Sequence, residues 1–366
     1  MTRGALACVL ALAPALAHAD PGEAEAPEQD APPPAPFLVG PRARLAIEVE
    51  LFADAGWIAR SGPDLTQFRL DRGETGATVG LGRHGGAEVR LESVRSAAEG
   101  GELGVAGDSL VMRVKRAQVF GDYESSGATL IGALGMTPDP WITALEEDDT
   151  ARPISATGSE RLLGWPTSDL AALGRFAWGP VRLTIAFGNG EGQAYPERNT
   201  GKTTTGVVEV LPLDTPDARL RVMAMARDGS LGPGSVRDRR FGGGATFASP
   251  LASAGVELVR AYGLDEVAAP EAWLLGGWAE VRPIPHTAAV ARGMTIGYDA
   301  GGRQTSVGAA LAVEPWRGPA RGRMRLWLAL DRTTSSGAAM PLPGFDPGDE
   351  TTLMVLASTT APFAIF

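Results

Sequence analysis

The sequence of 366 residues predicts an all-β fold, a transmembrane antiparallel β-barrel of about 16 strands with an inward-folded constriction loop. Three observations predict it. Apolar and polar residues alternate with a period of two along many segments, which gives an extended strand two different faces. The 48 glycines disfavour helix interiors. After residue 42, no run of 18 apolar residues is available for a membrane-spanning helix.

The first residues of the chain have the pattern of an export signal. Arg3 precedes an apolar run from Gly4 to Leu16, and Ala17-His18-Ala19 follows as a cleavage site. We therefore expect a signal peptide over residues 1–19. Residues 20–42 are acidic and rich in proline, which predicts a linker before a barrel over residues 43–366. The single cysteine lies inside the signal, which excludes a disulfide scaffold.

Four segments illustrate the alternation in the barrel region: 44–54, 181–187, 219–226 and 321–331. In 181–187, for example, Val181, Leu183, Ile185 and Phe187 alternate with Arg182, Thr184 and Ala186. The same criterion predicts sixteen strands, near 43–58, 66–83, 86–97, 109–123, 127–136, 167–178, 180–189, 203–213, 217–228, 237–248, 252–263, 271–282, 286–298, 303–315, 321–333 and 350–366. Short junctions mixed with long ones suggest that one end of the barrel has tight turns and the other has loops.

The polar faces of these strands favour a barrel filled with water. They carry arginine, glutamate and aspartate, which are costly to bury in a dry interior. A soluble propeller or β-helix would need a repeat of about 40 residues or a short solenoid repeat, and neither is visible. A wide barrel with a polar lumen and an apolar exterior accommodates both faces.

The segment 132–192 carries a family resemblance. It contains Pro140-Trp141 at a strand end, Glu160-Arg161 in an acidic loop, a strand from Asp169 to Gly174, and Asn189-Gly190-Glu191-Gly192. These features resemble the phosphate-selective porin family of the O and P type. The resemblance implies a sixteen-stranded pore in the outer membrane, usually a homotrimer, that passes small solutes and in some members prefers anions.

The long segment 137–165 falls between the fifth and sixth predicted strands. In sixteen-stranded porins this loop folds into the lumen and narrows it, so we expect a constriction loop here; an exposed, solvated loop is the alternative. Its expected charged residues are Glu146, Glu147, Asp148, Asp149, Arg152, Glu160 and Arg161.

Basic residues recur with a period of two on several predicted strands, and we expect them to line the pore. They are Arg113, Lys115, Arg219, Arg221, Arg237, Arg239, Arg321, Arg323 and Arg325. Arginine binds phosphate and carboxylate through a planar, permanently charged fork. One hypothesis is an arginine wall that faces the acidic loop across the constriction and favours anions. The other is that these arginines pair with lumen carboxylates and brace the barrel.

Composition and motifs weigh against other classes of function. The 33 basic and 43 acidic residues give a net charge of −10, which disfavours nucleic-acid binding. Gly107-Asp108-Ser109-Leu110 matches the first block of one hydrolase class, but neither His84 nor His286 has the Asp-x-x-His context that those enzymes need. We expect no cofactor and no metal, with outer-membrane lipid and permeating ions or anions as partners. A barrel enzyme of the phospholipase or esterase type, or a plugged structural barrel, remains the alternative.

Overall fold

The structure is a computed structural model that describes residues 44–60, 65–81, 83–95, 110–149, 156–193, 199–232, 235–263, 271–299, 301–317, 323–336 and 349–365. The signal peptide predicted over 1–19 and the linker predicted over 20–42 lie outside these residues and stay predictions.

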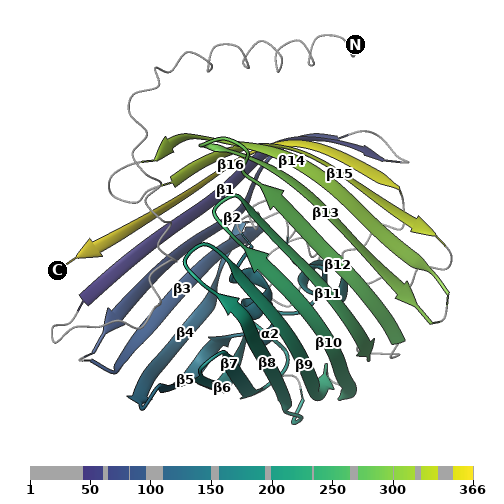
Figure 1. The fold of residues 1–366 in the computed structure, drawn as a ribbon. Coiled ribbons are helices and arrows are strands. Elements are labelled where there is room, and N and C mark those ends of the chain that lie inside the picture. The colour runs from purple at the N-terminus through teal and green to yellow at the C-terminus, as the bar shows by residue number, and fades with distance from the viewer. Residues whose placement is uncertain are drawn as a thin grey trace. The chain divides into compact units, whose positions relative to one another are not determined.

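Antiparallel strands form one closed barrel in these residues (Figure 1). Each strand pairs with its neighbours in the chain, and β1 closes the barrel against β16, from Leu45 beside Ile365 to Arg60 beside Glu350. The sixteen described strands are β1 (Arg44–Arg60), β2 (Leu65–Gly80), β3 (Gly85–Arg95), β4 (Leu110–Ser125), β5 (Ala128–Pro138), β6 (Ser168–Trp178), β7 (Val181–Gly188), β8 (Thr203–Asp214), β9 (Arg219–Leu231), β10 (Val236–Ala248), β11 (Ala252–Tyr262), β12 (Glu271–Val281), β13 (Thr287–Tyr298), β14 (Arg303–Arg317), β15 (Arg323–Ser336) and β16 (Glu350–Ile365).

The predicted fold class is confirmed, and many strand boundaries agree closely. The strand predicted over 203–213, for example, is β8 at Thr203–Asp214. The two ends of the barrel also differ as expected. The longest connections, 96–109, 139–167, 189–202 and 337–349, all join strand ends at the same end of the barrel, which we call the loop end. The opposite end, which we call the turn end, joins strands through short connections such as 126–127 and 179–180.

The two faces of the sheet have opposite character. On β7, Val181, Leu183, Ile185 and Phe187 are between 36% and 55% exposed on the outside. The residues between them, Arg182, Thr184 and Ala186, point into the lumen and are half-buried or buried. A continuous apolar exterior of this kind is disfavoured in water and matches the hydrocarbon of a bilayer.

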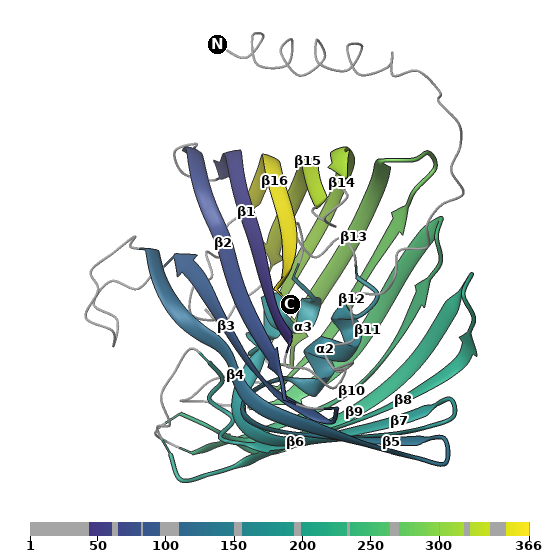
Figure 2. The same cartoon turned by 90° about the vertical axis from the view of Figure 1, so that its left-hand side faces the viewer.

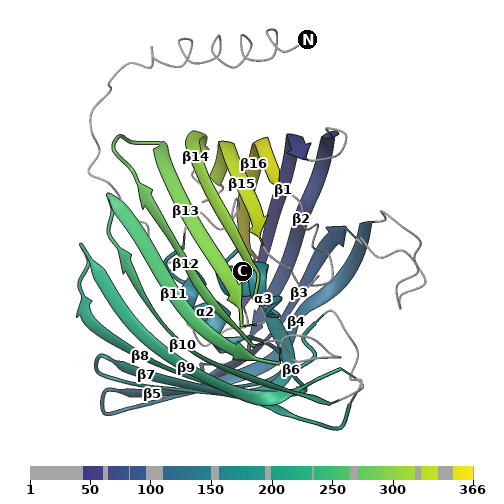
Figure 3. The ribbon, with the colours of Figure 1, turned by 90° about the vertical axis from the view of Figure 1, so that its right-hand side faces the viewer.

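The largest apolar core lies inside the barrel. Two short helices, α2 (Pro140–Glu146) and α3 (Gly158–Leu163), follow β5 and lie within the ring of strands (Figures 2 and 3). Their side chains pack against the lumen face of the wall from β7 to β13. No described helix has the length and apolarity needed to cross a membrane.

Candidate functional site

The constriction loop is the central feature of the lumen, and its inward folding is confirmed. Asp139 is the N-cap of α2 and accepts hydrogen bonds from the backbone N–H groups of Trp141, at 2.9 Å, and Ile142, at 3.1 Å. Thr157 caps α3 in the same way, and Gly164 ends α3 with a φ of +58°, a conformation that favours glycine. The indole N–H of Trp141 donates to Ser159, which joins the two helices.

A glycine on the wall makes room for α2. Gly244 of β10 faces the lumen, and a Cβ atom there would lie 3.3 Å from the ring of Trp141 and 2.8 Å from the carbonyl oxygen of Val256. A larger residue would therefore push α2 away from the wall. The small wall residue lets Trp141, which is fully buried, pack closely against β10.

A buried ionic network holds the start of the loop. Asp139 also accepts from the indole N–H of Trp165 at 3.0 Å and lies 3.7 Å from Arg227 of β9. Arg227 and Arg240 share the carboxylate of Asp238, at 2.8 and 2.7 Å. Both guanidinium groups also lie against the ring of Trp165, within 5.4 Å and 4.6 Å of its centroid. The network therefore ties the loop to β9 and β10.

A second anchor holds the start of α3. Glu257 of β11 is buried and accepts hydrogen bonds from the backbone N–H of Gly158, at 2.6 Å, and of Ser159, at 3.3 Å. Its second oxygen accepts from the Ser159 hydroxyl. A carboxylate placed this way satisfies the unpaired N–H groups of a helix start. Glu257 thus fixes α3 against β11.

The acidic end of α2 touches the arginines that were predicted to face it. Glu147 lies 2.8 Å from Arg221 and 3.3 Å from Arg182. Arg219 lies 3.6 Å from both Glu147 and Asp148. Arg221 also donates to the backbone carbonyl of Ala144 at 3.0 Å. Arg219 and Arg221 therefore contact the loop directly and do not face it across an open gap.

These contacts set the charge state of Glu147. Burial alone would raise its pKa, but the charges of Arg221 and Arg182 outweigh burial and hold the pKa below its ordinary value. Because a lowered carboxyl pKa in the folded state stabilises the fold above the unfolded pKa, this stabilisation is present at neutral pH. It is lost only as the pH falls through the lowered value.

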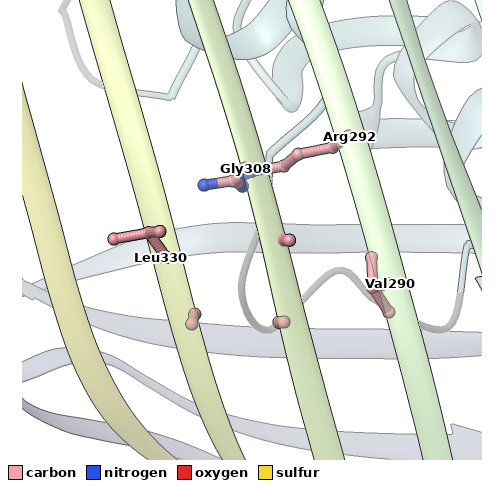
Figure 4. Close-up of a pocket in the computed structure, with 7 residues that line it drawn as sticks. Val290, Arg292, Gly308 and Leu330 are labelled. Atoms are coloured by element: carbon pink, nitrogen blue, oxygen red, sulfur yellow. The ribbon is translucent and has the colours of Figure 1, made fainter.

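A third anchor joins α3 to the wall formed by β13–β15. Arg161 donates to Asp331 of β15 at 2.9 Å. Asp331 also pairs with Arg292 of β13 and accepts from Ser306 of β14 at 2.9 Å. Figure 4 shows Arg292 extending across Gly308 of β14 toward β15. A Cβ at Gly308 would lie 2.8 Å from Nε of Arg292, so this glycine leaves room for the arginine to reach Asp331.

Substituting Gly308 tests this arrangement. We expect Gly308→Ala to displace Arg292 and lower the free energy of unfolding by about 1–3 kcal/mol, the usual cost of overpacking. Urea unfolding in detergent micelles measures it. Gly293→Ala is the matched control, because a Cβ there would lie 4.0 Å from its nearest neighbour, Val307. Equal stability of the two variants would contradict the steric role of Gly308.

The wall formed by β1–β4 carries a separate set of ion pairs. Lys115 of β4 donates to Glu74 at 2.6 Å and lies 3.8 Å from Glu92. Arg113 pairs with Glu92 at 2.8 Å. Across the sheet, Arg90 of β3 reaches Glu48 of β1 at 2.6 Å. Arg113 and Lys115 thus lie on the lumen face of β4, and each contacts a carboxylate.

The remaining predicted site residues lie in different places. Arg325 faces the lumen, pairs with Glu314 and lies over the ring of Trp327. Glu146, Asp149 and Glu160 are half-buried on the loop. Arg152 and Arg321 lie outside the described residues, and Arg323 is described only as part of the β15 backbone.

The structure corrects the predicted lumen position of Arg237 and Arg239. They lie on the outside of β10 at the loop end, where they pair with the exposed Asp228 at 2.8 and 3.5 Å. Asp238 and Arg240 occupy the lumen face instead, inside the network around Trp165. The physical reason is the alternation of a strand, since neighbouring residues point to opposite faces.

Several residues of the site were not predicted from the sequence. They are Glu74, Glu88, Arg90, Glu92, Arg227, Arg240, Asp238, Glu257, Arg292 and Asp331. The sequence holds a signal for some of them, because Glu88, Arg90 and Glu92 alternate with apolar residues along β3. For Glu257 there was none, because its partners are about a hundred residues away in the chain.

The motif Asn189-Gly190-Glu191-Gly192 has a structural role at the loop end. Asp169 accepts hydrogen bonds from the backbone N–H groups of Gly190, at 2.6 Å, and Gly192, at 3.2 Å. Both glycines have positive φ angles, +89° and +74°. Two of the matched segments of the resemblance therefore meet in space and hold the start of the β7–β8 connection.

Among the described residues, no group of side chains forms the catalytic site that the alternative, a phospholipase-type or esterase-type barrel, would need. Residues 107–109 of the hydrolase-like motif lie outside them. His84 is exposed in a turn and lies 3.2 Å from Asp122, and His286 occupies another turn with a φ of +62°. Within the described ranges, no three His, Cys, Asp or Glu side chains are placed to hold a metal ion.

Neither a protein-family model nor a curated protein sequence matches this chain. Solved structures do match. An anion-selective porin from Comamonas acidovorans is 12% identical, with a TM-score of 0.59 over 88% of this chain and 100% of that one. In-vitro folded OmpT in a trimer form, an outer membrane protein of Vibrio cholerae, is 10% identical, with a TM-score of 0.56 over 88% and 99%.

A third match is OccK1 (OpdK) of Pseudomonas aeruginosa, 10% identical, with a TM-score of 0.50 over 90% of this chain and 100% of that one. Membership of the phosphate-selective family stays a prediction. At these identities the likeness concerns the backbone, and it establishes that this chain has the β-barrel fold of outer-membrane porins.

Proposed function

We propose that the chain forms a water-filled pore in the outer membrane of a Gram-negative bacterium, through which small hydrophilic solutes and ions diffuse. The observation that carries this proposal is the contrast between an apolar exterior and a lumen wall rich in charged side chains. Charged side chains facing a lumen are stable when that lumen holds water. The outer-membrane setting is supported by the porin fold of the similar structures and by the predicted export signal.

The orientation and assembly form part of the same proposal. Outer-membrane barrels have short periplasmic turns and longer external loops, so we place the turn end in the periplasm. A homotrimer is proposed from the family resemblance and from the OmpT structure in trimer form. The apolar exterior would contact the lipid of the outer membrane, and small ions and solutes would permeate the pore.

Ion selectivity is the finer part of the proposal. The predicted lumen cations Arg113, Lys115, Arg219 and Arg221 all contact carboxylates. Paired charges largely cancel at a distance, so we propose weak selectivity, with any anion or phosphate preference small. The two helices of the loop pack against β7, β8, β12 and β13, and we propose that solutes pass between the loop and the β1–β4 wall.

Bilayer recordings test the pore and its selectivity together. We expect purified protein to conduct, with a reversal potential near zero in a KCl gradient and similar conductance in chloride and phosphate salts. Permeability ratios beyond about tenfold in either direction, which correspond to about 1.4 kcal/mol, would contradict weak selectivity. A folded barrel that conducts nothing would contradict the pore and favour a plugged barrel or an enzyme.

A further inference from the structure

The β1–β4 wall arranges its charges in rows across the barrel. In one row Glu50, Glu74 and Glu92 are direct cross-strand neighbours on β1, β2 and β3, and Arg113 follows on β4. The next row toward the turn end holds Glu48, Gly76, Arg90 and Arg116 in the same strand order. Both rows begin with a carboxylate on β1 and end with a guanidinium on β4.

A β-bulge strengthens the positive end. Arg90 pairs with Arg116 and Leu91 pairs with Val114, so Lys115 is the extra residue of β4. Because of the bulge, the consecutive residues Lys115 and Arg116 both contact lumen carboxylates, at Glu74 and Glu88. Together with Arg113, β4 presents three cations on the lumen face.

Exposure differs between the middle and the ends of the rows. Glu74, Glu92 and Lys115 are at most 2% exposed and are paired with one another. At the ends, the Glu48 side chain is 39% exposed, and those of Arg113 and Arg116 are 31% and 23% exposed. Each of these end groups is paired within the wall, yet its exposed part remains open to the lumen. A permeating solute therefore meets a carboxylate at the β1 edge and guanidinium groups at the β4 edge.

The neighbouring part of the wall, reached from β1 through β16, has a different character. Lumen-facing residues on β13–β16 include an apolar cluster of Ala288, Val290, Ala310, Ala312, Trp327, Ala329 and Leu356. The loop occupies the side from β7 to β13. The charged rows of the β1–β4 wall therefore end at β1 beside an apolar part of the barrel wall, since β16 pairs directly with β1.

We propose that the β1–β4 wall is a binding strip for dipolar solutes, namely zwitterions whose ammonium and carboxylate groups are well separated. The ammonium group lies toward Glu48 and Glu50, and the carboxylate lies toward Arg113 and Arg116. Strands are about 4.8 Å apart, so β1 and β4 lie about 14 Å apart along the wall. Flexible side chains shorten this span to the reach of long ω-amino acids and short peptides. The inference rests on the proposed pore and names its preferred class of solute.

Liposome swelling with the purified protein tests the strip. The probes are glycine, 4-aminobutyrate and 6-aminohexanoate, each compared with an uncharged hydroxy-amide of the same chain length. We expect the ratio of zwitterion to neutral rate to rise about threefold from the shortest to the longest probe, within the range that electrostatic steering provides. The double variants Glu48→Gln with Glu50→Gln, and Arg113→Gln with Arg116→Gln, should each abolish this rise.

The matched control is Arg237→Gln with Arg239→Gln, which removes two arginines from the outside of the barrel. It should keep the wild-type dependence on chain length. Swelling with the neutral probes reports whether each variant still folds and inserts. A flat ratio in the wild-type protein, or a ratio unchanged in both lumen variants, would overturn the strip while the pore stands. Absence of swelling with every neutral probe would overturn the pore itself.

Discussion

Replacing Asp139 by alanine is expected to release the start of the constriction loop and to lower the free energy of unfolding by about 3–5 kcal/mol, the cost of removing one partner from a buried ionic network. The variant loses the N-cap of α2 and the acceptor for Trp165. It also leaves Arg227 and Arg240 to share one carboxylate, that of Asp238. Urea unfolding in micelles measures the change.

Asp139→Asn separates the two roles of this residue. An asparagine oxygen can still cap α2, but its amide group would face the indole N–H of Trp165 and the guanidinium of Arg227. We expect the free energy of unfolding of Asp139→Asn to lie between those of the wild type and Asp139→Ala. Asp228→Ala is the control, since Asp228 pairs with arginines on the exposed exterior, where ion pairs contribute about 0–1 kcal/mol. If Asp139→Ala unfolded with the same free energy as Asp228→Ala, the role of Asp139 as an anchor of the loop would be contradicted.

The strands could be predicted from the sequence because one face of most of them is continuously apolar. On β9, Leu220, Val222 and Ala224 alternate with Arg219 and Arg221, so the lumen face follows directly from the pattern. The start of β10 lacks such a guide. There Arg237 and Arg239 alternate with Asp238 and Arg240, both faces are charged, and the sequence gives no basis for choosing the lumen side.

The loop could be placed from its length and position, but its partners could not. An aspartate before a proline is a typical start of a helix, so Asp139-Pro140 does indicate α2. The contacts of Asp139 with Arg227 and of Ser159 with Glu257 join residues roughly a hundred positions apart. Only the closure of the barrel and the register of each strand bring them together.

Glycine has a role that composition alone does not reveal. Arg90 lies across Gly76 to reach Glu48, and Arg292 lies across Gly308 to reach Asp331. In both places a glycine on the intervening strand lets an arginine lie flat against the wall and pair with a carboxylate two strands away. This arrangement keeps the guanidinium out of the passage and neutralises it, which supports a lumen that is polar yet weakly selective.

Replacing Glu257 by alanine is expected to free α3 and to increase single-channel conductance. The substitution removes the acceptor of two backbone N–H groups and of the Ser159 hydroxyl, all of them buried. Hydrogen bonds to a charged group contribute about 1.5–3 kcal/mol each, so we expect a loss of about 3 kcal/mol after local rehydration. The apolar packing of α3 against β12 depends on where Glu257 holds the start of α3. Without this anchor, the loop should move within the lumen and produce noisy, higher conductance levels.

Glu257→Gln keeps the side-chain shape and one acceptor oxygen, so it should retain most of the wild-type conductance. Glu271→Ala is the matched control, since Glu271 pairs with Arg260 on the exposed exterior. Combining Asp139→Ala with Glu257→Ala gives a further test, because both residues hold the same loop. Once one anchor is lost the second should contribute less, so the combined loss of stability should be smaller than the sum of the two single losses. Strict additivity, with unchanged conductance in each single variant, would mean that the loop is held by its apolar contacts alone.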